Sequence, residues 1–293
     1  MLYDLPERAR LILRDTVYLV RSVKRRVFDS SKSPLILCNS YPKSGTHMLS
    51  QILENIPNVK YWNDIVSVQS LSGVMNSKEH IRYKLSSVPG GSLVRSHLMY
   101  SDEILSVLSE RDYKKLFIYR DPRDVVISHA NWVMKEPKIY LNKIYTECYE
   151  DNNQRIMASI EGVPLGKLFG SSSSQPDIAQ DFERWKGWIN DPQTLAIRFE
   201  DLVGERGGGD ENKRQNLIRD IFKHIGYDVS DEDLISMFSS HSMNPEKSHT
   251  FRKGNKGSIA GWKNKFTNEH KDTFKKVTGK LLIELGYEKD MDW

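Results

Sequence analysis

A short apolar run, a polar turn and an amphipathic helical pattern follow one another directly between residues 34 and 56. The run from Pro34 to Ser40 has the length of a buried strand, and apolar residues from Met48 to Ile56 recur at helical spacing. A strand that enters a helix through one tight turn is the unit from which parallel sheets are built. Three further runs have the strand pattern, and each is followed by a polar turn and a helical pattern. These strands are predicted at Ser92–Ser96, Lys115–Tyr119 and Thr194–Phe199, and helices at Asp124–Met134 and Gln215–Ile225.

The alternation of strands and helices predicts an α/β fold with a central, mainly parallel sheet flanked by helices. We expect one domain, residues 34–293, because the serine-rich stretch 166–176 and the glycine-rich stretch 204–212 have no second core pattern beside them and are interpreted as inserted loops. Residues 1–33 form a separate basic and amphipathic segment. We interpret it as a helix lying on its own domain, with contact to a membrane surface as the alternative.

Charge and cysteine content exclude several classes of protein. The 293 residues include 43 Lys and Arg against 39 Asp and Glu, a formal net charge of +4. This small excess does not indicate a nucleic-acid partner, and it fits a ligand with a few negative charges at one local site. No stretch approaches the ~20 apolar residues of a membrane span. Cys38 and Cys148 can build neither a disulfide framework nor a four-thiolate zinc site. We therefore expect a soluble, cytoplasmic protein.

The turn between the first strand and the first helix has the composition of a phosphate site. Gly45 permits close backbone approach, Ser44 and Thr46 add hydroxyl donors, and Lys43 adds a full charge. Ordinary turn chemistry is the alternative. The Walker motif of ATPases is excluded, because it needs its lysine after the second glycine, whereas here the lysine precedes the one glycine of the turn.

A second polar turn, Tyr119–Ser128, also lies between a predicted strand and a predicted helix. Arg120 stands at the strand end and offers a planar fork for a phosphate. Asp121 and Pro122 form a good helix start, so a plain helix cap is the alternative. The two interpretations are compatible, since a cap and a phosphate site can share one helix end.

Together these turns resemble the two nucleotide-binding motifs of the cytosolic-type sulfotransferases, which use 3′-phosphoadenylyl sulfate (PAPS). Two further elements of that family follow in family order: the strand end at Phe199–Leu202 and a glycine-rich basic stretch at Phe251–Asn264. The resemblance runs from about residue 34 to 270 and implies that the first motif holds the 5′-phosphosulfate and the second the 3′-phosphate. It implies these nucleotide-binding residues: Lys43, Ser44, Gly45, Thr46, His47, Met48, Arg120, Ser128, Phe199, Phe251, Arg252, Lys253 and Gly254.

The resemblance also assigns catalytic roles. His97, in the segment VRSHL at a predicted strand end, matches the family's general base. A histidine suits this task because its ordinary pKa of ~6.5 leaves a neutral ring near neutral pH. Lys43 is expected to neutralise charge on the oxygen that bridges sulfur and phosphate, and Ser128 to hold Lys43 away until the acceptor binds. No metal is required, and we expect none. His47, His129 and His224 are weaker candidates for the base.

Four departures from the family pattern affect details. Met48 stands where the family has an adenine-stacking tryptophan, and Phe199 replaces a tyrosine. The C-terminal phosphate loop is longer than usual, so either Arg252–Gly254 or Lys256–Gly257 faces the 3′-phosphate; Arg252 is favoured. The family's dimer motif keeps only part of its pattern, which favours a monomer or a different dimer. It retains Lys263 and Thr267 but has Asn268 and Asp272 at two changed positions.

The acceptor is expected to be a small molecule with a hydroxyl or an amine. By family position the pocket is lined by His129 and Trp132, together with Tyr100 and Tyr140. Tyr145 and Trp62 are further candidates. Half-buried packing is an equally good interpretation of these aromatic side chains.

Two other functions stay open at this point. An ATP-dependent small-molecule kinase could use the same turn, but it would need metal-binding carboxylates and a lysine after the glycine. An inactive nucleotide-binding module is the other alternative, with Met48 and Phe199 as signs of drift. The joint presence of four family residues weighs against that alternative: Lys43, His97, Arg120 and Ser128.

Overall fold

The computed structural model describes residues 34–54, 56, 59–69, 75–164, 174–227, 230 and 259–293. The expected amphipathic segment 1–33 lies outside the described residues. So do four of the expected nucleotide-binding residues, Phe251, Arg252, Lys253 and Gly254, and the alternative copy at 256–257.

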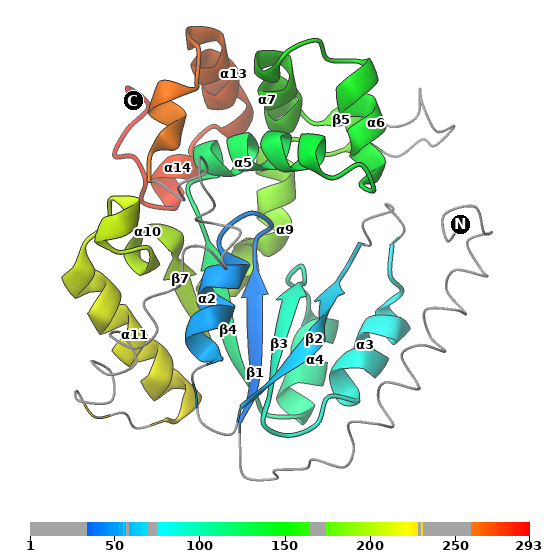
Figure 1. The fold of residues 1–293 in the computed structure, drawn as a ribbon, viewed down its shortest axis with the longest axis vertical. Helices are drawn as coiled ribbons and strands as arrows, with labels where there is room; N and C mark the ends of the chain where they lie inside the picture. The colour runs from blue at the N-terminus through cyan, green and yellow to red at the C-terminus, as the bar shows by residue number, and fades with distance from the viewer. Residues whose placement is uncertain are drawn as a thin grey trace.

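A five-stranded sheet in the order β2-β3-β1-β4-β7 forms the centre of the molecule, and each neighbouring pair is parallel (Figure 1). The predicted fold class, an α/β domain with a central parallel sheet, is confirmed. The strands are β1 (Leu35–Ser40), β2 (Lys60–Ser67), β3 (Ser92–His97), β4 (Tyr113–Tyr119) and β7 (Thr194–Arg198), and a separate antiparallel pair joins β5 (Val163–Pro164) to β6 (Ser174–Gln175).

Strand β1 is the middle strand of the sheet, and every one of its six residues is buried. Ile36 and Cys38 belong to the core cluster beneath helices α2 and α11, whereas Leu35 and Leu37 belong to the larger cluster on the opposite face. Side chains of successive strand residues point to opposite faces, so a sheet covered on both sides needs such a continuous apolar run. The run at 34–40 therefore predicted the most buried strand correctly.

Helices cover both faces of the sheet and gather at the carboxyl ends of its strands (Figure 1). Helices α2 and α11 contact one face, and α3 and α9 contact the other, with α4 packed beside α3. The helices are α2 (Thr46–Leu53), α3 (Lys78–Ser86), α4 (Asp102–Glu110), α5 (Pro122–Lys135), α6 (Tyr140–Glu147), α7 (Asn152–Glu161), α9 (Ile178–Asn190), α10 (Phe199–Leu202), η2 (Glu205–Gly207), α11 (Glu211–Ile225), η3 (Gly261–Asn264), α13 (Asn268–Thr278) and α14 (Leu281–Glu284).

The structure corrects two local predictions and adds one strand that was not predicted. The strand predicted at Thr194–Phe199 ends at Arg198, because Phe199 opens helix α10. The glycine-rich loop at 204–212 contains η2 and the start of α11. Strand β2 was missed because two polar residues interrupt its sequence KYWNDIVS, and its pairing with β3 shifts register between Trp62 and Val66.

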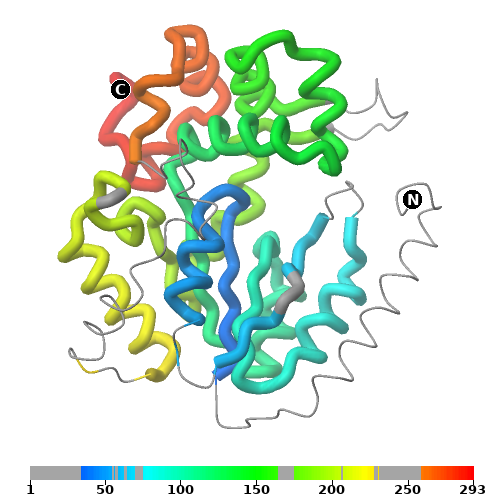
Figure 2. Tube along the Cα trace, in the orientation of Figure 1, coloured from blue at the N-terminus to red at the C-terminus, as the bar shows by residue number. Residues whose placement is uncertain are grey.

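The C-terminal segment returns to the carboxyl end of the sheet. Figure 2 shows it, in orange and red, beside the start of α5 and beside α10. A backbone hydrogen bond of 2.9 Å from Trp262 N–H to Asp124 Oδ1 fixes η3 on α5. Thr267, which the sequence assigned to a degraded dimer motif, caps α13 through a reciprocal pair of contacts with His270. Within the described residues, no helix is long and apolar enough to cross a membrane.

Candidate active site

The turn between β1 and α2 has the backbone geometry of an anion site. Gly45 is the N-cap of α2 with φ of 103°, and Lys43 also has a positive φ, 69°. The first N–H groups of a helix have no partner within the helix and point out of its N-terminus. The turn therefore places the N-terminus of α2 at the carboxyl end of the most buried strand.

Ser44 supplies the observation that most favours a ligand at this turn. Its side chain is fully buried, and among the residues that the structure describes no hydrogen-bond partner reaches its Oγ. A buried hydroxyl without a partner costs about 1–3 kcal/mol. A phosphate or sulfate oxygen on the turn would satisfy this hydroxyl, so the residues present fit a phosphorylated ligand.

Gly45 is also required by the space around it. A Cβ at this position would lie 2.6 Å from Cδ2 of Phe199, whose ring is fully buried. Phe199 in turn carries the guanidinium of Arg120 on its face at 4.4 Å. The glycine, the ring and the arginine thus form one packed unit that joins the first predicted motif to the second.

We predict that Gly45→Ala lowers the free energy of unfolding by about 1–3 kcal/mol, because alanine is strained at this φ and its Cβ displaces Phe199. The displaced ring should also weaken nucleotide binding. Gly226→Ala is the matched control, since Gly226 has φ of 81° and nothing within 4 Å of its added Cβ. Thermal unfolding and calorimetry check both variants. Equal losses of stability and unchanged binding in the two would contradict the packing argument.

His97 lies at the end of β3, beside the end of β1. Its Nδ1 is 3.1 Å from the carbonyl oxygen of Ser40 and 3.0 Å from Ser40 Oγ. A carbonyl oxygen can only accept, so Nδ1 carries the proton and Nε2 holds the lone pair. Burial lowers the pKa of His97 from its ordinary value, with the Ser40 carbonyl opposing and Lys43 and Arg95 adding to that shift. The ring is therefore neutral and able to accept a proton.

Lys43 lies with Nζ 4.8 Å from the ring centroid of Trp132 on α5. This contact of a cation with an aromatic face is attractive. The pKa of Lys43 is lowered to about 8, chiefly by burial; Glu136 opposes this shift, and Arg120 and Lys135 contribute to it. A phosphate nearby would stabilise the charged form. Ser128, expected to hold Lys43, is half-buried and lies one turn before Trp132 on α5.

Arg120 lies directly after β4 and is buried. Its Nη2 is 3.1 Å from Asp124 Oδ2, and its guanidinium packs on the face of the Phe199 ring. Asp121 accepts the backbone N–H of Arg123 at 2.9 Å and caps α5, and Pro122 occupies its first turn. The helix-cap interpretation of this segment is thus confirmed, and it coexists with a fixed arginine at the same helix end.

A polar chain joins the predicted acceptor residue His129 to the helices beyond it. Its Nδ1 is 3.0 Å from Ser159 Oγ, and Ser159 Oγ is 2.9 Å from the hydroxyl of Tyr145. The His129 ring lies 6.0 Å from that of Trp132. Burial lowers the pKa of His129 to about 4, and Lys43 adds to this shift. The structure therefore brings Lys43, Trp132 and a neutral His129 together.

Among the remaining aromatic candidates, Tyr145 also contacts His129, with ring centroids 6.1 Å apart. Tyr100 packs edge-on against Trp188 of α9, with ring centroids 5.3 Å apart. Tyr140 lies at the start of α6 and hydrogen-bonds Gln69. Tyr145 and Trp62 are buried in the larger core cluster. The interpretation as core packing residues therefore applies to Tyr145 and Trp62.

Two residues of α2 that are expected to bind the nucleotide differ in solvent exposure. Met48 is fully buried among apolar residues of the α2 face, so an adenine contact there stays a prediction. His47 is exposed, and its Nδ1 accepts from Arg95 Nη1 at 2.8 Å. Arg95, two residues before His97, also lies over the ring of Tyr61 at 4.5 Å.

The weaker base candidate His224 lies on α11, and its Nε2 is hydrogen-bonded to the Lys115 carbonyl oxygen at 3.0 Å.

Sequence reasoning missed several residues that shape the site. Ser40 Oγ lies 2.6 Å from Thr46 Oγ1 and 3.0 Å from His97 Nδ1, so it connects the β1–α2 turn to His97. Asp124 was assigned only to a helix start, yet it holds both Arg120 and η3. A polar residue ending a buried strand, as at Ser40, was the available signal. In the part of the chain described, no cluster of three or more His, Cys, Asp or Glu side chains could hold a metal ion.

Family models, curated sequences and solved structures include proteins similar to this chain. The model described as the sulfotransferase domain matches residues 33–286. Sulfotransferase 6B1 of Danio rerio is 24% identical over 258 residues, covering 83% of this chain and 76% of the relative. A flavonol sulfotransferase-like protein of Flaveria bidentis is 25% identical, covering 88% and 84%. A crystal structure of mouse sulfotransferase SULT7A1 complexed with PAP shares the fold with a TM-score of 0.58 and 19% identity, covering 89% of both chains.

Proposed function

Since this chain belongs to the sulfotransferase domain family, of the cytosolic type, and is a PAPS-dependent sulfotransferase, we propose that it transfers the sulfuryl group to a small-molecule acceptor with His97 as general base. PAPS supplies an activated sulfuryl group whose leaving group is adenosine 3′,5′-bisphosphate. The acceptor atom is a hydroxyl oxygen or an amine nitrogen that attacks in line with the leaving group.

Residues of the two motifs divide the binding of PAPS between them. The β1–α2 turn offers backbone N–H groups, Gly45 and the unpartnered Ser44 hydroxyl to the 5′-phosphosulfate. Thr46 adds a second hydroxyl. Arg120 and Ser128 are proposed for the 3′-phosphate, with Arg120 fixed by Asp124. Residues 251–254 are proposed to complete that side.

The hydrogen bonds of Ser40 carry this proposal. The Ser40 carbonyl oxygen accepts a hydrogen bond from Nδ1–H of His97, and the Ser40 hydroxyl lies within hydrogen-bond distance of both His97 and Thr46. One residue at the end of β1 thereby fixes the tautomer of the base and its distance from the phosphate turn. A general base held beside a turn of hydrogen-bond donors suits group transfer to an acceptor, because the positioning of the reacting groups contributes much of the rate.

His97 Nε2 is proposed to take the acceptor's proton while the acceptor attacks sulfur. Lys43 supplies a positive charge on the side where the leaving oxygen becomes negative. Trp132 holds the Lys43 ammonium in the structure, and His129 lies next to it as a neutral ring. These two side chains are proposed to form the acceptor wall, where the aromatic face suits a ring-bearing acceptor. Tyr100 and Tyr140 are proposed for its outer part.

Binding calorimetry with adenosine 3′,5′-bisphosphate and with ATP tests the donor class. We expect tight binding of the bisphosphate without added metal and much weaker binding of ATP. A kinase that used the same turn would instead bind ATP in a magnesium-dependent manner. That outcome would overturn the proposed donor.

The pH profile should show two limbs set by His97 and Lys43. Because the pKa of His97 is lowered, kcat/KM should stay constant down to pH ~6.5 and fall only below it, as the base becomes protonated. The basic limb should lie near pH 8, where Lys43 loses its proton. In kcat this limb should move to higher pH, because bound phosphates favour the charged amine. Initial rates from pH 5 to 10 check this, and a basic limb that Lys43→Arg leaves unmoved would contradict it.

The cellular setting and the assembly are proposals as well. Cys38 and Cys148 are free thiols, as a reducing cytoplasm favours. We propose that residues 34–293 are the catalytic domain and that 1–33 precede it as a separate segment. A monomer, or a dimer of a kind other than the family's, stays a prediction.

A further inference from the structure

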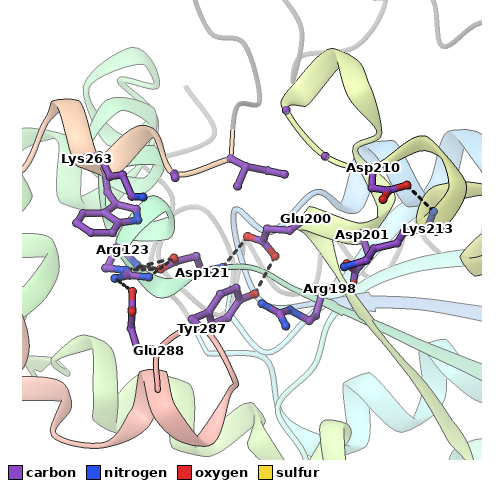
Figure 3. Close-up of a pocket in the computed structure, with 15 residues that line it drawn as sticks. Asp121, Arg123, Arg198, Glu200, Asp201, Asp210, Lys213, Lys263, Tyr287 and Glu288 are labelled. Carbon is purple, nitrogen blue, oxygen red and sulfur yellow. Dashed lines mark hydrogen bonds and ion pairs between the residues drawn. The ribbon is translucent and has the colours of Figure 1, made fainter. Parts of the chain in front are cut away.

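The carboxylate of Glu200 connects two segments that are far apart in the sequence. Its Oε1 accepts the backbone N–H of Asp121 at 3.1 Å, and its Oε2 accepts the hydroxyl of Tyr287 at 2.8 Å. Figure 3 shows these side chains around a cleft of about 650 Å³, with Glu200 between Asp121 and Tyr287. Through Glu200, the C-terminal turn that carries Tyr287 is thus connected to Asp121, the residue after Arg120.

A second connection runs through Arg123. Its Nη2 is 2.7 Å from Asp121 Oδ2, and its Nη1 contacts the carboxylate of Glu288. The guanidinium lies 4.0 Å from the ring of Trp262 and 4.6 Å from that of Trp293, so two aromatic rings flank it. Asp121 is therefore fixed by Glu200 on its backbone and by Arg123 on its side chain.

Tyr287 has little freedom to leave this arrangement. The Arg198 guanidinium lies 4.3 Å over its ring, and the Tyr119 ring meets it edge-on at 6.5 Å. Hydrogen bonds between buried groups in a low-dielectric network are strong, and a missing member leaves the others unsatisfied. The contacts of Tyr287 thus order both residues that flank Arg120 in sequence, Tyr119 and Asp121.

The position of Glu200 gives this connection a functional consequence. Glu200 follows Phe199, whose ring supports the Arg120 guanidinium, and it bonds the backbone next to Arg120. We propose that Tyr287, acting through Glu200, is a positioning residue that sets Arg120 for the 3′-phosphate of the donor, an inference that rests on the proposed function. Tyr287 touches no phosphate itself; it fixes the arginine that does.

The test measures the affinity added by the 3′-phosphate alone. Calorimetry gives the dissociation constants of adenosine 3′,5′-bisphosphate and adenosine 5′-monophosphate. The ratio of the monophosphate constant to the bisphosphate constant reports the 3′-phosphate contact. Tyr287→Phe removes only the hydroxyl. We expect it to lower this ratio by about tenfold, or about 1.4 kcal/mol, and to change binding of the monophosphate less than about twofold.

Tyr113→Phe is the matched control, since Tyr113 also donates its hydroxyl to a buried acceptor, the Leu85 carbonyl at 2.8 Å, at the far end of the same strand β4. It should lose stability but keep the wild-type ratio. Equal weakening of both nucleotides in Tyr287→Phe, or an unchanged ratio, would overturn the inference. A wild-type ratio near one would instead overturn the proposed 3′-phosphate site, so the two failures are distinguishable.

Discussion

Replacing His97 by alanine is expected to lower kcat for sulfuryl transfer by about 10²- to 10⁴-fold, the contribution of a well-placed general base. The Ser40 carbonyl accepts a hydrogen bond from Nδ1–H of His97 and so keeps the proton on Nδ1, which leaves the Nε2 lone pair available. The substitution removes that lone pair. Binding of adenosine 3′,5′-bisphosphate should be nearly unchanged, because the phosphate turn keeps its own Ser40–Thr46 contact. Initial rates and calorimetry on the same preparation measure both effects.

His224→Asn is the control for this experiment. His224 is another partly buried histidine that bonds a carbonyl oxygen, at 3.0 Å, but it lies on α11 under the sheet. It should leave kcat within about threefold of wild type, since only a base that reaches the acceptor gains the catalytic factor. Near-normal turnover of His97→Ala would remove His97 from the mechanism.

The second large effect is expected at Lys43. Lys43→Met should lower kcat by about 10²- to 10³-fold, as removal of one charge-stabilising donor does in other enzymes. Methionine is chosen because it keeps an unbranched apolar stem against Trp132 while removing the ammonium. The loss should appear in kcat more than in KM for the acceptor, because the charge acts on the leaving oxygen rather than on acceptor binding.

Lys135→Met provides the matched comparison at an exposed lysine of the same region. It should leave kcat near wild type and move the basic limb of the pH profile upward, because the charge of Lys135 contributes to the lowered pKa of Lys43. A Lys43→Met variant that keeps its kcat but loses acceptor affinity would show that Lys43 only lines the acceptor pocket.

The local parts of the site could be predicted from the sequence because their signals are contiguous. The turn at Gly45 lies between an apolar run and a helical pattern, and the structure has β1 and α2 there. Arg120 follows a second such run, and Asp121 and Pro122 begin the helix after it. In a parallel sheet the carboxyl ends of neighbouring strands meet at one edge, so turns that follow such strands are brought together.

The contacts that hold those turns in place could not be predicted in this way. Glu200 and Tyr287 are 87 residues apart, and Arg123 and Glu288 are 165 apart. No periodicity or spacing pairs residues at such separations. Their partners are chosen by how the C-terminal segment packs on α5, a tertiary property.

Packing also gives the aromatic candidates different surroundings. By family position Trp132 was expected in the acceptor wall and Tyr145 was a further candidate. In the structure Trp132 carries Lys43 on its face, whereas Tyr145 is fully buried and its hydroxyl contacts Ser159. An aromatic side chain has the same apolar body in both settings. Only the neighbours supplied by other helices distinguish a pocket wall from a core residue.

The most direct test of the account is transfer of labelled sulfate from PAPS to a panel of phenols, alcohols and amines in the presence of EDTA. We expect a labelled sulfated product from the wild-type protein with at least one acceptor class, and at least about 100-fold less from His97→Ala. Equal product from the two proteins, or a product formed only from magnesium and ATP, would contradict it.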